Sequence, residues 1–232
     1  MRYLGGKARV AKRIVEQLNL LRQPGQPYYE PFLGGCSILP FMANPRFGSD
    51  IQPELAMLYD AIRDGWQPPR VVTEDEYRQL KAAPPSALKA FVGYGCSYGG
   101  KFFGGYAQDP TGRNYASNCT NWCAKVAPRL QGAQFTCVDY ASVSYADNSL
   151  IYCDPPYFST TGYSTKFDHA RFWQWCRDMA AAGHTLLVSE YTAPSDVPVL
   201  LEFQRSIEMR SSVKTAALIR TERLYLLKGS TP

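Results

Sequence analysis

The tetrapeptide Asp154-Pro155-Pro156-Tyr157 is the most chemically informative part of this 232-residue chain. It follows the apolar run 150–153, which is typical of a buried strand. Open α/β sheets bind their ligands at the carboxyl ends of strands. A carboxylate, a proline carbonyl and an aromatic ring at such a place would suit a planar group that carries an amine, such as a nucleobase. The alternative interpretation is a plain strand followed by a turn, since Asp and Pro are common turn residues.

A second element of this kind lies nearer the N-terminus. A short strand at 28–32 runs into Gly34 and Gly35, and another short strand at 46–50 ends in Asp50. Glycines let the backbone approach a ligand closely, and an acid about 20 residues further on can hold a ribose hydroxyl pair. The order of strand, glycine loop, helix, strand and acid is typical of the first half of a nucleotide-binding α/β unit.

The length of 232 residues is that of one large domain, or of a domain with an insert. The net charge of +5 is mildly basic and compatible with a polyanionic partner. No apolar stretch is long enough to cross a bilayer, and the first residues lack the apolar core of a signal peptide. We therefore expect a cytoplasmic protein without membrane contact.

The cysteines do not indicate a metal site. There are seven, and the close pair Cys119 and Cys123 has no companion pair and no nearby histidine. Buried reduced thiols in a cytosolic protein fit this pattern better.

Hydrophobic periodicity predicts strands and helices on both sides of a middle section with a different composition. Helices are expected at 7–21, 37–43, 53–63, 118–130 and 169–182, the last capped by Asp168. Strands are expected at 28–32, 46–50, 135–139, 150–154 and 185–191. Two further strands, 202–209 and 222–228, are predicted to pair antiparallel.

The middle section contains a glycine and aromatic run at residues 93–107. One interpretation is a flexible loop or a bulged edge strand, because glycine weakens regular strands. The other is a surface that presents aromatic rings and backbone donors to a nucleic acid. Both stay open at this point.

Several short motifs follow one another in a fixed order along nearly the whole chain. Tyr-x-Gly-Gly-Lys at 3–7 precedes Glu-Pro-Phe-Leu-Gly-Gly at 30–35, and Asp50, the glycine and aromatic run and the tetrapeptide at 154–157 come next. This order resembles the Dam-like (alpha-class) DNA adenine methyltransferases, specifically the short enzymes of phages and prophages. Segments 167–169, 189–194 and 220–224 also resemble that subgroup.

The resemblance implies an α/β fold with a Rossmann-like class I methyltransferase sheet. Such a sheet has seven mostly parallel strands and an antiparallel C-terminal hairpin. Residues 1–63 and 134–232 would form the catalytic domain that binds S-adenosylmethionine. Residues 64–133 would form an inserted target-recognition subdomain.

The resemblance also implies residue roles. Asp154, Pro155, Pro156 and Tyr157 would be the catalytic motif. The residues that would contact the cofactor or form its pocket are Tyr3, Lys7, Glu30, Phe32, Gly34, Asp50, Asp139 and Asp154. One position departs from the family's Phe-x-Gly-x-Gly loop, because Cys36 stands where the last glycine is usual. Gly35 is expected to supply the conformational freedom instead.

The implied reaction is methyl transfer to the exocyclic N6 amine of adenine in double-stranded DNA, with the base rotated out of the duplex. Tyr157 would stack on the base, and residues 158–167 would form a loop that closes over it. Candidates for DNA contact are Tyr98, Lys101, Phe102 and Lys214. If phages encode the protein, it would work in the bacterial cytoplasm, in regulation or in restriction and modification.

Other functions remain open for the same motifs. Methylation of the cytosine N4 amine uses the same chemistry, although those enzymes more often carry Ser in place of Asp154. Methylation of RNA or of a protein glutamine more commonly involves Asn there. A non-catalytic DNA-binding decoy with the same fold is the remaining class, and the altered residue Cys36 keeps it open.

Overall fold

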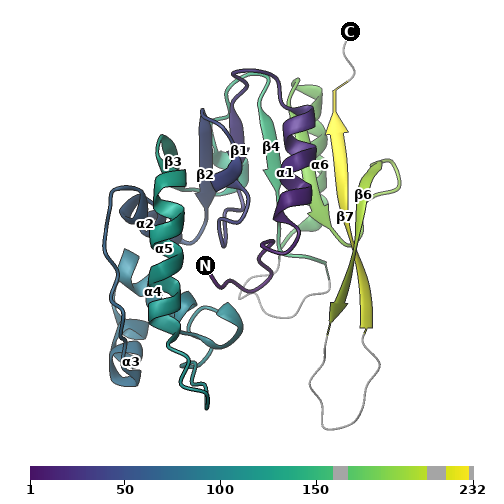
Figure 1. Cartoon of the computed structure of the whole chain (residues 1–232). Coiled ribbons are helices and arrows are strands. Elements are labelled where there is room, and N and C mark those ends of the chain that lie inside the picture. The colour runs from purple at the N-terminus through teal and green to yellow at the C-terminus, as the bar shows by residue number, and fades with distance from the viewer. Residues whose placement is uncertain (159–166, 208–217, 230–232) are drawn as a thin grey trace. The chain divides into compact units, whose positions relative to one another are not determined.

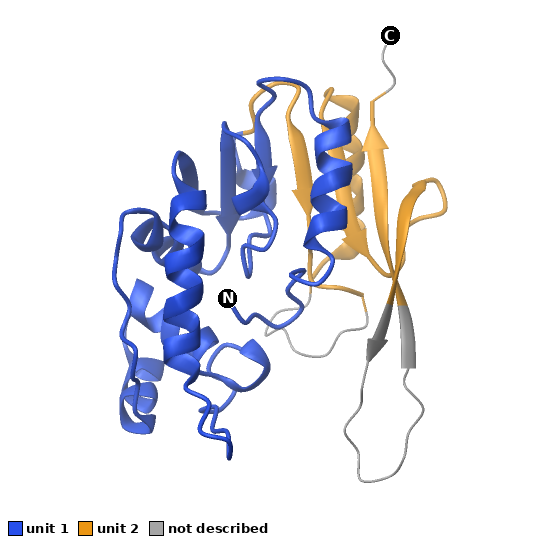
Figure 2. Ribbon diagram, in the orientation of Figure 1, with its two compact units in different colours: residues 1–144 blue, residues 145–232 orange. Residues whose placement is uncertain are grey.

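The computed structural model describes residues 1–158, 167–207 and 218–229, without the side chains of 205–207 and 218–220. The chain divides into two compact units, residues 1–144 and 145–232 (Figure 2). Both units contain helices and strands (Figure 1).

The described part of the chain forms a seven-stranded mixed sheet. Its strands are β1 (Tyr28–Glu30), β2 (Arg46–Asp50), β3 (Ala133–Cys137), β4 (Leu150–Cys153), β5 (Thr185–Glu190), β6 (Val199–Ile207) and β7 (Leu218–Lys228). The strand order is β3-β2-β1-β4-β5-β7-β6. The predicted α/β fold, with a seven-stranded sheet that ends in an antiparallel C-terminal pair, is confirmed.

In the first unit, β1, β2 and β3 run parallel, with Tyr28 opposite Arg46 and Arg46 opposite Ala133. Helix α1 (Ala11–Leu21) buries one apolar face through Ile14 and Leu18. Helix α2 (Pro53–Arg63) follows β2 and has the limits that the sequence predicted. Proline suits the first position of a helix, because its missing N–H has no intrahelical partner there.

Residues 64–130 add three helices to the first unit: α3 (Glu74–Ala82), α4 (Ala87–Gly95) and α5 (Tyr115–Leu130). Thr73 and Glu76 form a reciprocal capping box at the start of α3. Helix α2 packs against α4, α5 and β3, which joins this segment to the sheet in one core.

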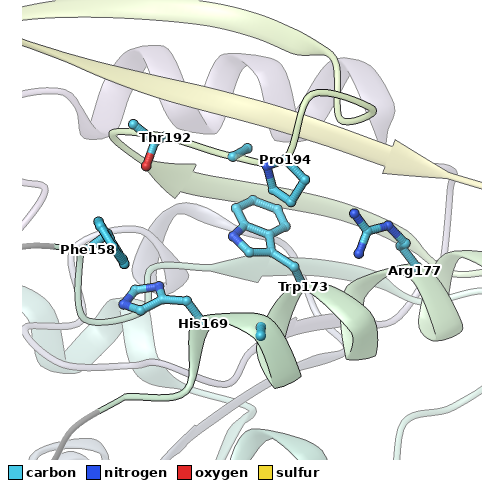
Figure 3. Close-up of a pocket in the computed structure, with 8 residues that line it drawn as sticks. Phe158, His169, Trp173, Arg177, Thr192 and Pro194 are labelled. Atoms are coloured by element: carbon cyan, nitrogen blue, oxygen red, sulfur yellow. The ribbon is translucent and has the colours of Figure 1, made fainter.

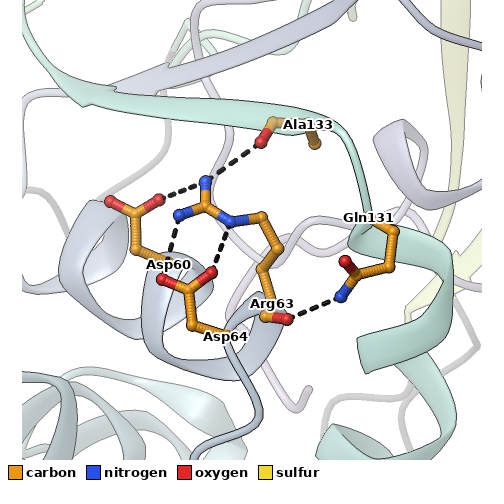
Figure 4. Close-up of polar contacts among 5 residues, drawn as sticks. All are labelled: Asp60, Arg63, Asp64, Gln131 and Ala133. Carbon is orange, nitrogen blue, oxygen red and sulfur yellow. Dashed lines mark hydrogen bonds and ion pairs between the residues drawn. The ribbon is translucent and has the colours of Figure 1, made fainter.

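Arg63 at the end of α2 joins that helix to the segment that leads into β3 (Figure 4). Its Nη1 donates to the carbonyl of Ala133 at 3.0 Å and lies 2.7 Å from Asp60. Its backbone carbonyl accepts from Nε2 of Gln131 at 2.6 Å. Asp64 pairs with the other guanidinium nitrogens. The points where the chain leaves and rejoins the sheet layer are therefore bonded to each other.

Two sequence predictions in this unit are wrong. The helix expected at 37–43 is only a short 3-10 turn, η1 (Leu39–Phe41), because Pro40 removes a backbone donor and Met42 is extended. The run 93–107 is neither a loop throughout nor an edge strand. Its first residues end α4, and a 3-10 turn, η2 (Tyr98–Gly100), follows.

Gly93 has no side chain, and this lets Phe102 and Phe103 pack directly against α4. A Cβ on Gly93 would lie 2.5 Å from Phe102 and 2.6 Å from Phe103. The amide of Phe103 also donates to the carbonyl of Gly93 at 2.8 Å. The glycine therefore serves close packing of aromatic rings, which neither sequence interpretation anticipated.

In the second unit, β4 and β5 are parallel, while β7 pairs antiparallel with both β5 and β6. Helix α6 (His169–Ala181) starts as predicted, because the Asp168 carboxylate accepts from the amide of Arg171 at 2.9 Å. Gly183, with φ of 94°, follows the helix. Helix α6 packs on β5 and β7.

All seven cysteines are free thiols. No helix in the described ranges combines the length and apolar character that crossing a membrane requires.

Candidate functional site

The glycine loop of the first unit is held by Asp50, the last residue of β2. One carboxylate oxygen accepts from the amide of Gly34 at 2.9 Å, and the other accepts from the amide of Gln52 at 3.1 Å. On the far side, the hydroxyl of buried Tyr59 donates to the carbonyl of Gly34 at 2.7 Å. Hydrogen bonds from two different elements thus fix the loop.

Tyr3 lies across this loop. A Cβ on Gly34 would be 2.9 Å from Tyr3 Cε1, and one on Gly35 would be 2.8 Å from Tyr3 Cβ. The ring of Tyr3 also lies 5.0 Å from that of Tyr94. The two glycines therefore let Tyr3 approach the backbone, so the structure brings together two of the predicted cofactor elements.

The prediction for the altered loop position is wrong. Cys36 itself adopts the left-handed conformation, with φ of 48°, and Gly34 does so with φ of 44°. Gly35 keeps an ordinary φ. A left-handed L-residue is strained, whereas glycine, which has no Cβ, adopts this conformation freely. Burial raises the pKa of the Cys36 thiol well above its usual value, so the thiol is neutral and packs as a small apolar group.

Burial also raises the pKa of Asp50, against the effect of the backbone hydrogen bonds from Gly34 and Gln52. A carboxylate has about four lone-pair sites, and these two amides, with a third backbone hydrogen bond from Ile51, leave at least one of them open. The half-buried acid therefore keeps acceptor capacity for a hydroxyl pair, as the nucleotide-binding pattern requires.

The other predicted cofactor residues lie on neighbouring elements of the same unit. Lys7 is buried, and its Nζ donates to the carbonyl of Gly5 at 3.1 Å. Glu30 is buried and accepts from the Tyr28 hydroxyl at 3.2 Å. Phe32 stacks on Tyr140 with the ring centroids 5.2 Å apart.

Asp139 lies just beyond β3, where it caps the 3-10 turn η3 (Tyr140–Ser142). Its carboxylate accepts from the amide of Ala141 at 3.0 Å. The preceding residue, Val138, donates its amide to the carbonyl of Asp50 at 3.1 Å. Asp139 is therefore the next residue after one whose backbone amide is hydrogen-bonded to Asp50.

In the second unit, the tetrapeptide 154–157 follows β4 as predicted. Asp154 is half-buried and Pro155 is buried. The hydroxyl of Tyr157 donates to Oε1 of Glu222 on β7 at 2.8 Å, and its ring meets Tyr191 edge-on at 4.7 Å. Burial, followed by the nearby carboxylates of Asp154 and Glu222, raises the pKa of Tyr157 well above its usual value. The phenol therefore stays protonated and anchors the tetrapeptide to β7.

Glu190 at the end of β5 is a buried acid that the sequence analysis gave no role. Its carboxylate accepts from the amides of Phe158 at 3.1 Å and Tyr191 at 2.7 Å. Nδ1 of His169 lies 3.7 Å away. The pattern that singled out Asp50 and Asp154, an acid at the end of a buried strand, applies equally to this residue and could have found it.

The DNA-contact candidates differ in their exposure. Tyr98 and Lys101 are exposed, whereas Phe102 packs against Tyr94 with ring centroids 4.7 Å apart. A cavity of about 520 Å³ includes Lys101 and Phe102 among the residues that line it. Arg78 and Lys81 from α3 also line this cavity. Lys214 lies outside the described residues.

Neither this cavity nor a second one in the other unit is lined by Asp50 or Asp154. Within the described ranges, no three His, Cys, Asp or Glu side chains form a group that could hold a metal ion.

Residues 3–86 match the family model of the D12 class N6 adenine-specific DNA methyltransferases. No curated protein matches the chain. Among solved structures, the chain is similar to the crystal structure of SMU.472, a candidate methyltransferase complexed with SAH, with a TM-score of 0.36 and 9% sequence identity. The match covers 98% of this chain but 55% of the other, so the chain spans about half the length of that relative.

Proposed function

We infer that this chain, through residues 3–86, is a member of the D12 class of N6 adenine-specific DNA methyltransferases, and we propose that it methylates adenine N6 in DNA. The observation that carries the proposal is the Asp-Pro-Pro-Tyr segment at the carboxyl end of β4, in a chain whose N-terminal part matches that family. This segment lies outside the matched residues, so it is separate support for the same chemistry.

S-adenosylmethionine would bind through the first unit and supply an electrophilic methyl group on a sulfonium sulfur. The residues there fit such a ligand, because the glycine loop is fixed by Asp50 and that acid keeps acceptor capacity. Phe32 offers a half-buried ring, and Glu30, Lys7, Tyr3 and Asp139 would complete the pocket.

Asp154 and Pro155 would prepare the adenine amine for attack. The N6 lone pair is delocalised into the purine ring, which makes this nitrogen a poor nucleophile. Donating one N–H to the Asp154 carboxylate and the other to the Pro155 carbonyl would favour a tetrahedral nitrogen with a localised lone pair. The nitrogen would then bond to the methyl carbon as the carbon–sulfur bond breaks and the sulfonium leaves as a neutral thioether, and an N6 proton would pass to Asp154 or water. Preorganised acceptors of this kind stabilise charge that develops during the reaction.

The adenine must leave the stack before its amine can reach these acceptors. Tyr157 would stack on it, with its hydroxyl anchored to Glu222. We propose residues 64–133 as the target-recognition insert, with Tyr98, Lys101, Phe102 and Lys214 in contact with DNA. Lysine contacts with phosphates would make affinity fall with added salt. We also propose that the enzyme belongs to the phage and prophage subgroup and takes part in regulation or in restriction and modification.

The test is incubation of the protein with DNA and S-adenosylmethionine, followed by mass spectrometry of the nucleosides. N6-methyladenine is expected. Asp154→Ala should lower the yield by about 100-fold or more, the effect of losing a preorganised catalytic group. Asp147→Ala removes an exposed acid of the same unit and should leave the yield unchanged.

Other outcomes would replace the proposal. N4-methylcytosine would select the cytosine enzyme, and no product from a folded protein that binds the cofactor would select the decoy. Near-normal turnover of the Asp154→Ala variant would remove the catalytic role of that residue.

A further inference from the structure

A cavity of about 400 Å³ opens in the unit 145–232, directly beyond the catalytic tetrapeptide (Figure 3). Its first wall is Phe158, the residue after Tyr157. The other walls come from α6 and from the segment that follows β5. The lining residues are Phe158, His169, Ala170, Trp173, Arg177, Thr192, Ala193 and Pro194.

The walls of this cavity are largely aromatic. His169 meets Phe158 edge-on at 5.3 Å between ring centroids. Trp173 is buried, and its ring meets the ring of Tyr225 edge-on with the centroids 5.9 Å apart. Pro194 lies beside its indole (Figure 3). Phe158 differs from these residues because 58% of it is exposed. Its ring therefore has a surface that a flat ligand could cover.

Polar groups stand at the edge of the same cavity. Arg177 is held by Asp196 through two bonds of 2.8 Å, from Nε and Nη2. Its Nη1 forms no hydrogen bond or ion pair with any described side chain or backbone group. The hydroxyl of Thr192 and the imidazole of His169 supply further hydrogen-bonding atoms (Figure 3). Fixed donors around aromatic walls are typical of small-molecule sites, and the volume lies in the usual range for them.

The position of Phe158 is set by the catalytic segment and by β5. Its amide donates to Oε2 of buried Glu190 at 3.1 Å. Asp154 and Phe158 are four positions apart in the sequence, so their Cα atoms are at most about 14 Å apart. The cavity is therefore within reach of the nucleotide whose amine Asp154 takes, or of its neighbour along the strand.

We propose that this cavity is a nucleobase subsite, in which an unstacked base of the DNA substrate lies on Phe158 beside Trp173. The proposal rests on the proposed function for the identity of the substrate. The base would be the one next to the target adenine, because Asp154 and Tyr157, which would hold the target, do not line this cavity. Stacking on a protein ring tolerates any base, because every base has a π-face.

The test measures binding alone, with single-stranded thymidine oligonucleotides that carry one 2-aminopurine. Quenching of that fluorescent base reports stacking, and titration gives the dissociation constant. Phe158→Ala should weaken binding by roughly 5- to 100-fold, the usual effect of removing one base-stacking ring. Phe158→Tyr keeps a flat ring and should bind as the wild type does.

Two controls separate stacking from general damage. Phe41→Ala removes a similarly exposed phenylalanine, 51% exposed, from the other unit and should not change binding. A strand of the same length in which every position is abasic should bind wild type and Phe158→Ala equally. Calorimetry with S-adenosylmethionine should give the same affinity for both proteins.

A second pair of oligonucleotides distinguishes the two sources of the base. One carries 2-aminopurine in place of the adenine that is methylated, and the other carries it one position away. Quenching that depends on Phe158 is expected with the second oligonucleotide, and finding it with the first alone would overturn the assignment to the neighbouring base. The subsite is refuted if Phe158→Ala binds intact and abasic strands as the wild type does.

This result is independent of methylation. If DNA gains no methyl group but binding still depends on Phe158, the subsite stands and the proposed reaction fails. If methylation occurs and Phe158→Ala binds normally, only the subsite is wrong.

Discussion

Replacing Gly34 by alanine should destabilise the protein, and much of the loss should depend on the ring of Tyr3. Gly34 has φ of 44°, where L-residues are strained. The added Cβ would also lie 2.9 Å from Cε1 and 3.1 Å from Cζ of Tyr3. Tyr94 lies against that same ring, which limits how far the ring can move away.

The expected magnitude has two parts. A left-handed L-residue costs about 1–2 kcal/mol. Forcing an extra carbon into a packed contact costs about 1–3 kcal/mol more. Gly34→Ala should therefore lower the free energy of unfolding by roughly 2–5 kcal/mol, a large share of the stability of a typical domain. In a Tyr3→Ala background only the backbone part, about 1–2 kcal/mol, should remain.

The assay is a double-mutant cycle followed by urea denaturation. Wild type, Gly34→Ala, Tyr3→Ala and the double variant are compared at constant slope, so that midpoints report stability. Gly25→Ala is the matched control, because φ is 75° there and a Cβ would meet no atom within 4 Å. Additive effects, within about 0.5 kcal/mol, would refute the packing of Tyr3 on the loop. Calorimetry with S-adenosylmethionine on the same proteins should show weaker binding for Gly34→Ala.

Three further substitutions test other contacts. Gly93→Ala should lower the free energy of unfolding by about 1–3 kcal/mol, because its Cβ would lie 2.5 Å from Phe102, and this outweighs the helix preference of alanine. An unchanged urea midpoint would mean that the Phe102 ring can move away without cost. Tyr157→Phe should cost roughly 1–3 kcal/mol, because it removes the 2.8 Å donor to buried Glu222, and unchanged stability would show that the bond contributes nothing. Burial raises the pKa of Asp50 above 3.8, so the folded state keeps this proton to a higher pH than the unfolded state does. The wild type should therefore lose stability relative to Asp50→Asn as pH rises from about 4 through the raised pKa; urea midpoints of both proteins across that range check this, and a constant difference would contradict it.

The sequence predicted the elements best where local signals were strong. Helix 53–63 has a proline at its start, and its limits agree with the structure. Asp50 and Asp154 were singled out because each was predicted at the end of a short strand, and the structure places both at strand ends. The antiparallel pairing of the last two strands, predicted at 202–209 and 222–228, is also confirmed.

The contacts around the candidate residues of each unit join positions far apart in the sequence, and no local pattern reveals them. Tyr3 meets Gly34 across about thirty residues, and Tyr157 meets Glu222 across 65. The conformation of Cys36 was likewise hidden, because a sequence shows a missing glycine but not which residue takes the strained angle. For the same reason, Gly93 was read as a loop glycine rather than as one that admits two rings.

The bonds of Arg63 to Gln131 and Ala133 also have an evolutionary consequence. The segment between α2 and β3 begins and ends at residues that are hydrogen-bonded to each other, so its two ends are held together. A segment whose ends are joined in this way could be lengthened, shortened or exchanged between related chains while the parallel strands keep their register. Under the proposed recognition role, specificity could change by exchange of this segment as long as the side chains of Arg63 and Gln131 are retained, because Ala133 contributes only its backbone carbonyl.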